Sequence, residues 1–230
     1  MSGGKMSGRV KVLCLVVVLV VLGAGVALWS TRSDGDAEAL RAPAEPCWNG
    51  IPRRATLQKL LGPGTELTSD TDKFRFVKEH WPSSCRYEAL SDEDGRAPVL
   101  NVSATWQRDL PPVEEISTID GRRGDTRAPL DMGAHAFYVR ASQAVYFECD
   151  VDLPAGAPAY VKRDRYVGVY IYARPMKGTG LSAVEARKVG LDIMLQLAHD
   201  LADRAGCEND TGLPDAVPAI GKANWPGYDG

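Results

Sequence analysis

The first pattern along the chain is a run of apolar residues near its N-terminus. Residues 12–29 carry no charged side chain, and residues 12–22 are almost entirely Val and Leu. In a bilayer the backbone must satisfy its own hydrogen bonds, so such a run becomes a helix. Eighteen residues of helix rise about 27 Å, which is close to the thickness of the hydrocarbon core. The pattern therefore predicts a single transmembrane helix over residues 12–29.

The charges beside this run predict its orientation. Lys5, Arg9 and Lys11 precede it, whereas Arg32 alone follows it before the first acidic residue. Basic residues favour the cytoplasmic side, so residues 1–11 are expected to be a short cytoplasmic tail, with the remainder outside the cell membrane. A cleaved signal peptide is the alternative, because the apolar run is followed by small residues. Both interpretations place the folded part outside the cytoplasm.

Composition divides the rest of the chain into three parts. Residues 30–46 are polar and Ala-rich with two prolines, which is typical of a linker. Residues 213–230 contain three prolines and three glycines without clear periodicity, and predict a flexible tail. The extracytoplasmic domain is therefore expected over residues 47–212.

Alternating apolar and polar positions predict several strands in this domain. Residues 99–107 alternate, and the aromatic-rich residues 136–140 and 144–150 are close enough in the chain to form a hairpin. Residues 166–173 place Val and Ile on one face and Tyr on the other. The tyrosines are a possible binding face, because tyrosine is common at recognition surfaces, with a purely structural stripe as the alternative. They are Tyr166, Tyr170 and Tyr172.

Two helices are expected from the 3.6-residue period. Residues 56–61 form a short one that a Gly-Pro-Gly sequence stops. The long one begins at Ser182, which forms a capping box with Glu185, and ends at Gly206. Its apolar side comprises Val184, Leu191, Met194, Leu195, Ala198 and Leu201; its polar side comprises Lys188, Asp192, Gln196, His199 and Asp203. A long C-terminal helix on an antiparallel sheet is an α+β domain.

The domain contains four cysteines, Cys47, Cys85, Cys149 and Cys207. Four cysteines allow three pairings, and disulfides suit an exported chain. We expect Cys47 to pair with Cys85 and Cys149 with Cys207, because each pair then joins elements that are close in chain order. The second bridge would attach the end of the long helix to the strand at residues 144–150.

Charge and motifs limit the possible chemistry. Residues 34–230 contain 23 basic and 30 acidic side chains, so binding to nucleic acid is not expected. The cysteines show no CxxC spacing for zinc, and no motif for a cofactor or a catalytic nucleophile occurs in the domain. We therefore assign no catalytic, metal or cofactor residue. The histidines, His80, His135 and His199, are interpreted as solvated surface residues.

Three pieces of the chain carry a resemblance to a known group of proteins. They are the cysteine and short helix of residues 47–62, the sequence Cys85-Arg86-Tyr87, and the helix end at residues 202–207. Their order resembles exported or membrane-anchored actinobacterial proteins of unknown function. The layout, over residues 47–214, is also similar to extracellular sensor domains of bacterial Ser/Thr kinases. The resemblance implies a disulfide-bonded α+β fold and no known activity.

Many proteins of this group are lipoproteins, but Cys14 lies inside the apolar run rather than after it. A lipid-modified cysteine is therefore not expected. Two functions follow from the sequence. The first is a membrane-anchored binding or accessory module for an envelope protein, a peptidoglycan fragment or a small ligand. The alternative is a cell-envelope hydrolase whose site forms only in three dimensions.

The predicted topology can be tested on intact protoplasts. A protease added outside should digest the domain, because the basic residues precede the apolar run. Protection of the domain would contradict the topology. A mature N-terminus near Ala27 would select the cleaved signal peptide over the membrane anchor.

Overall fold

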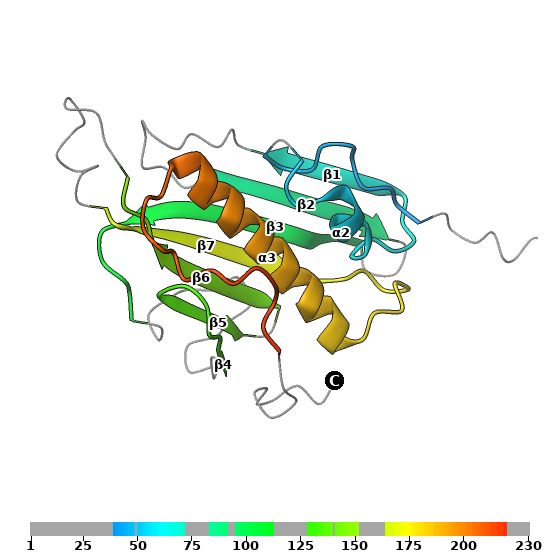
Figure 1. The fold of residues 1–230 in the computed structure, drawn as a ribbon. Helices are drawn as coiled ribbons and strands as arrows, with labels where there is room; N and C mark the ends of the chain where they lie inside the picture. The colour runs from blue at the N-terminus through cyan, green and yellow to red at the C-terminus, as the bar shows by residue number, and fades with distance from the viewer. Residues whose placement is uncertain are drawn as a thin grey trace, which may run out of the picture. The chain divides into compact units, whose positions relative to one another are not determined.

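An antiparallel sheet forms one layer of the fold, and a long helix lies across one of its faces (Figure 1). The computed structural model describes residues 39–48, 50–71, 83–91, 95–112, 128–139, 141–151 and 164–219. The strands in these residues are β1 (Glu66–Thr71), β2 (Ser83–Ser91), β3 (Gly95–Gln107), β4 (Ala128–Pro129), β5 (His135–Val139), β6 (Ser142–Glu148) and β7 (Tyr166–Ala173). The helices are α2 (Arg54–Gln58) and α3 (Ala183–Ala205). The predicted α+β class is confirmed for this part of the chain.

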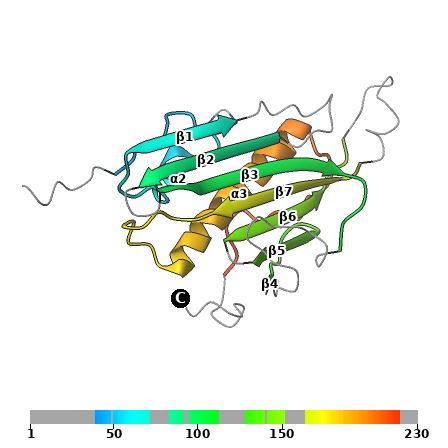
Figure 2. The ribbon, with the colours of Figure 1, turned by 180° about the vertical axis from the view of Figure 1, so that it is seen from behind.

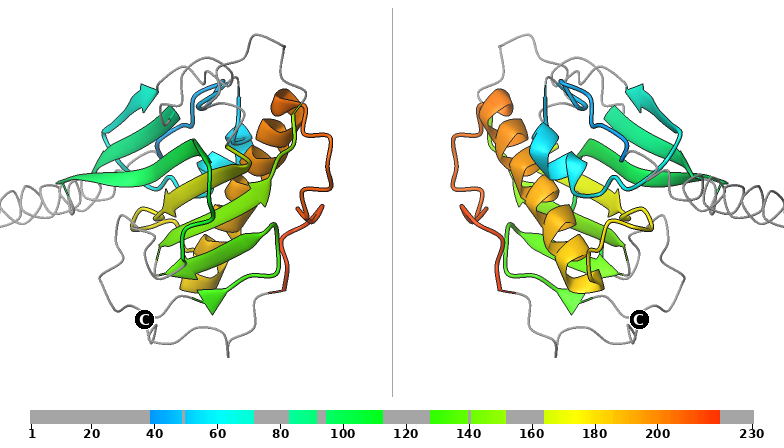
Figure 3. Two further views of the ribbon diagram at one scale, coloured as in Figure 1. Left: turned by 90° about the vertical axis from the view of Figure 1, so that its left-hand side faces the viewer. Right: turned by 90° about the vertical axis from the view of Figure 1, so that its right-hand side faces the viewer.

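The strand order is β1-β2-β3-β7-β6-β5-β4, so the last strand in sequence lies at the centre of the sheet. Every neighbouring pair is antiparallel, and β5 and β6 form the predicted hairpin. Val167, Val169 and Ile171 of β7 are at most 2% exposed and belong to the main core. Figure 3 shows α2 and α3 on the same side of the sheet, where this core lies.

Helix α3 begins and ends as its sequence predicts. The Ser182 hydroxyl accepts a hydrogen bond from the Glu185 N–H, and the Glu185 carboxylate accepts one from the Ser182 N–H. Gly206 ends the helix with a φ of 68°, in the left-handed region. The predicted apolar side is buried with one exception. Val184 is 42% exposed, because the first turn projects beyond the strands that α3 crosses (Figure 1).

A glycine sets how closely α3 approaches the sheet. A Cβ atom added at Gly190 would lie 2.6 Å from the Gln143 side-chain nitrogen, well inside van der Waals contact. Gln143 of β6 is itself 2% exposed and points toward the helix. Arg187, nearly one turn earlier in α3, is also buried and lies near Tyr138. The layer between helix and sheet thus contains polar side chains beside its apolar core.

Both expected disulfides are present. Cys47 and Cys85 are bonded with their Cα atoms 5.5 Å apart, and Cys149 and Cys207 with theirs 4.8 Å apart. The second bridge joins the residue after β6 to the residue after the Gly206 cap. Asn209 strengthens this junction, because its side chain accepts from the Asp150 N–H and donates to the Glu148 carbonyl. The C-terminal end of α3 is therefore attached to the sheet by covalent and polar contacts.

Segments on both sides of the predicted domain also pack against it. Ala42, in the predicted linker, is buried, and its N–H donates to the Gln58 side chain of α2. Leu213 and Val217, in the predicted tail, pack against the main core. The packed part of the chain therefore extends at least from Leu40 to Val217, beyond the predicted boundaries at both ends.

The predicted transmembrane segment at residues 12–29 lies outside the described residues. Among the residues that are described, no helix has the length and hydropathy needed to cross a membrane.

Removing the Cys149–Cys207 bridge should lower stability while leaving the other bridge intact. The bridge spans a sequence separation of 58, and on the chain-entropy model a loop of that size contributes about 4 kcal/mol. In Cys207→Ser we expect the thermal midpoint to fall by on the order of 10 °C and Cys149 to become reactive to alkylation upon denaturation.

Non-reducing peptide mapping of the same variant should still find Cys47 joined to Cys85. A Cys47→Ser variant is the matched control and should keep the Cys149–Cys207 peptide. A peptide that joins Cys47 to Cys149 or to Cys207 in the unsubstituted chain would contradict the pairing.

Candidate functional site

The predicted tyrosines lie on the side of the sheet opposite α3, because the residues that alternate with them in β7 are in the main core with the helix. Figure 2 views the sheet from this opposite side. Tyr166, Tyr170 and Tyr172 of β7 are paired with Gln107, Ser103 and Asn101 of β3, respectively. Tyr166 and Tyr170 are half-buried, whereas Tyr172 is only 7% exposed. The three tyrosines therefore share one face, as expected, but do not form one open aromatic surface.

Tyr170 belongs to a chain of hydrogen bonds within the sheet face. Its hydroxyl accepts from the Gln107 side-chain nitrogen at 3.0 Å and is hydrogen-bonded to the Tyr146 hydroxyl. The Tyr146 and Tyr170 rings meet edge to face with centroids 5.5 Å apart. Burial raises the pKa of both phenols, so both remain protonated at physiological pH. Tyr170 thus has a structural role that its place in a tyrosine stripe does not reveal.

A smaller apolar cluster surrounds this network. It contains Phe137, Val139, Ala144 and Tyr146, with Leu110 and Tyr170 packed against it. Gly168 makes room for the Tyr146 ring, since a Cβ at this position would lie 2.8 Å from a ring carbon. This part of the tyrosine face is a second core. Ligand binding by Tyr166, Tyr170 and Tyr172 stays a prediction.

The polar side of α3 contacts other parts of the chain along much of its length. Asp192 accepts a hydrogen bond from the Thr56 hydroxyl at 3.4 Å, and the Gln196 side chain accepts one from the Arg53 N–H at 3.1 Å. These contacts hold the N-terminal end of α2 against the helix. Residues from the predicted polar side of α3 therefore position a neighbouring element.

His199 makes the corresponding contact with the C-terminal segment. One of its ring nitrogens lies 3.0 Å from the Pro214 carbonyl oxygen, at hydrogen-bonding distance. His199 is therefore half-buried rather than fully solvated, because residues after α3 turn back along the helix and contact it. His135 is half-buried at the start of β5, and its Nδ1 atom has no hydrogen-bond partner within the described ranges. His80 lies outside those ranges.

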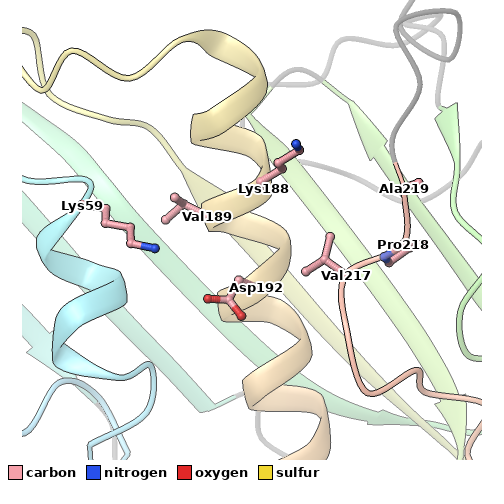
Figure 4. A pocket seen from close by; sticks show the side chains of 7 residues that line it. All are labelled: Lys59, Lys188, Val189, Asp192, Val217, Pro218 and Ala219. Atoms are coloured by element: carbon pink, nitrogen blue, oxygen red, sulfur yellow. The ribbon is translucent and has the colours of Figure 1, made fainter.

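A groove of 490 Å³ lies over the outward face of α3, between α2 and the C-terminal segment (Figure 4). Val189 and Asp192 of α3 are in its floor, with Lys188 beside them. Lys59, just after α2, stands on one side, and the C-terminal segment stands on the other. The described residues that line the groove are Lys59, Lys188, Val189, Asp192, Val217, Pro218 and Ala219.

The groove combines charged and apolar groups. Lys59 and Lys188 are exposed, and within the described part of the chain neither forms an ion pair or a hydrogen bond. Asp192 is half-buried and is held by Thr56. The groove has a net positive lining with an apolar wall at Val217 and Pro218, so it is suited to an anion that carries a small apolar group.

Sequence reasoning missed this groove. Helical periodicity places Lys188 and Asp192 on the polar side of the long helix, and it predicts no role for Lys59 or Val217. More than a hundred residues separate Lys59 from Lys188 in the sequence, and the C-terminal segment follows later still. No local sequence pattern connects these segments. The described residues contain no group of His, Cys, Asp and Glu that could hold a metal ion.

Comparisons with protein-family models, with curated proteins and with solved structures found no match to this chain.

The structural role of Tyr170 can be tested with a phenylalanine substitution. Tyr170→Phe removes the hydroxyl that Gln107 and Tyr146 both contact, so the free energy of unfolding should fall by about 1–3 kcal/mol. Tyr166→Phe is the matched control, because no hydrogen bond of the Tyr166 hydroxyl occurs within the described part of the chain. Its effect should stay below about 0.5 kcal/mol in urea titrations. Equal losses in both variants would contradict the role of the network.

Proposed function

We propose that this chain is a membrane-anchored extracytoplasmic binding module that holds its ligand in the groove over α3. The observation that carries the proposal is the groove itself. Its volume of 490 Å³ lies within the range of sites for small ligands, which combine apolar walls with a few polar groups.

The location outside the cytoplasm is supported by two independent features. Both disulfides join buried or half-buried cysteines of the domain, and such bonds persist in oxidising compartments. The apolar run at residues 12–29 would hold the domain at the membrane, with basic residues on the cytoplasmic side.

The chemistry of the groove favours binding over hydrolysis. Its described lining contains no histidine, serine or cysteine that could act as a base or nucleophile. His199, the nearest histidine in the sequence to the floor residues, is engaged with the Pro214 carbonyl. A hydrolase is therefore the weaker of the two functions.

Substitutions in the C-terminal segment test whether the groove binds. Ala219→Trp should fill the groove, because Ala219 is exposed in its wall. Ala216→Trp is the matched control, since Ala216 is exposed in the same segment and does not line the groove. The ligands are soluble peptidoglycan fragments that retain their peptides, titrated into the full chain in detergent micelles.

We expect the unsubstituted chain and Ala216→Trp to bind equally, and Ala219→Trp to lose at least about tenfold in affinity, or about 1.4 kcal/mol. Mass spectrometry of the same samples should recover the fragments uncleaved. Equal binding by both tryptophan variants would contradict the site, and cleaved fragments would support the hydrolase.

A further inference from the structure

Two lysines face the same groove from different elements. Lys59 follows α2, and Figure 4 shows its side chain directed toward α3. Lys188 lies in α3, one turn before Asp192. Within the described ranges neither ammonium group has a carboxylate within 4.0 Å. Glu185, nearly one turn earlier in α3, interacts electrostatically with Lys188 without forming an ion pair within 4.0 Å. Two exposed cations beside one concave surface raise the local concentration of anions.

Asp192 restricts which anions fit. Its Oδ2 atom accepts the Thr56 hydroxyl, so the carboxylate is held in the floor of the groove. A fixed negative charge in the same groove disfavours a dianion, since like charges repel at short range. The same carboxylate can accept a hydrogen bond from an N–H group. A monoanionic ligand with an adjacent amide N–H therefore matches these three side chains better than a phosphate does.

The apolar wall suits a small side chain next to that carboxylate. Val189 forms part of the floor, and Val217, Pro218 and Ala219 form the side opposite Lys59. These groups are compact and present no hydrogen-bond donor from their side chains. A small apolar residue can therefore lie against them while a carboxylate beside it reaches the lysines.

We propose that the groove binds the C-terminal end of a short peptide whose last residue is small and apolar. Lys59 and Lys188 hold the free carboxylate, Asp192 accepts the last peptide N–H, and Val217 and Pro218 contact the side chain. This inference rests on the proposed function, because it names the ligand class of the same groove.

A matched pair of peptides tests the carboxylate directly. N-acetyl-Ala-Ala-Ala with a free carboxylate and the same peptide with a C-terminal amide differ only in that group. Each is titrated into the full chain in detergent micelles by calorimetry, with inorganic phosphate as a third probe. The free acid should bind at least about tenfold more tightly than the amide, and phosphate should bind more weakly than the free acid.

Substitutions identify the groups that hold the carboxylate. Lys59→Gln and Lys188→Gln should each weaken binding of the free acid about fivefold to tenfold and reduce its advantage over the amide. Lys188→Arg keeps the charge and should retain most of the affinity. Arg86→Gln removes an exposed cation from the opposite face of the sheet, so the affinity for the free acid should not change. Because Lys59 and Lys188 are exposed and form no ion pair within 4.0 Å in the described structure, the thermal midpoint should change little in their variants.

The outcomes separate this inference from the proposed function. Equal affinity for acid and amide, or an equal loss in Arg86→Gln and the lysine variants, would overturn the carboxylate site. A different result is that peptidoglycan fragments bind, that Ala219→Trp abolishes this binding, and that the free acid does not bind. In that case the proposed ligand class is wrong, but the groove is still the binding site. If neither ligand binds, both proposals fail.

Discussion

The contact between α3 and the central strands β7 and β6 is the interaction on which the rest of the structure depends. It buries the Val and Ile side chains of β7 under the apolar side of the helix, and these three elements supply about half of the residues of the main core. Burial of this apolar surface is the largest favourable contribution to folding. Gly190 determines how closely the helix approaches Gln143, and the Cys149–Cys207 bridge fixes its C-terminal end. The position and direction of α3 on the sheet are thereby fixed.

Once α3 is fixed, its outward face becomes a surface on which other segments can pack. Asp192 and Gln196 hold the start of α2, and His199 lies against the Pro214 carbonyl of the returning C-terminal segment. The space between these two segments is the groove that contains Lys59 and Lys188. The candidate site is thus a consequence of how two short segments pack beside one helix.

The opposite face of the sheet shows a different use of polar side chains. Gln107, Tyr170 and Tyr146 form a chain of hydrogen bonds beside a second apolar cluster. A buried hydroxyl group without a hydrogen-bond partner is destabilising, and these hydrogen bonds give the two tyrosine hydroxyls their partners. The fold therefore has a functional candidate on the helical side and a second, smaller core on the other.

The sequence by itself predicted the long helix, the β5–β6 hairpin, β3 and β7, and it favoured the disulfide pairing that the structure has, but it did not predict β1, β2 or β4. The capping box at Ser182, the left-handed Gly206, the alternation of β7 and the two disulfides are confirmed, since each depends on residue type and on spacing along the chain. Only the tertiary structure decided that β7 lies between β3 and β6 and that His199 contacts the Pro214 carbonyl. It also brought Lys59, Lys188 and Val217 to one groove. These features depend on contacts between distant segments, and helical or strand periodicity carries no information about which segments meet.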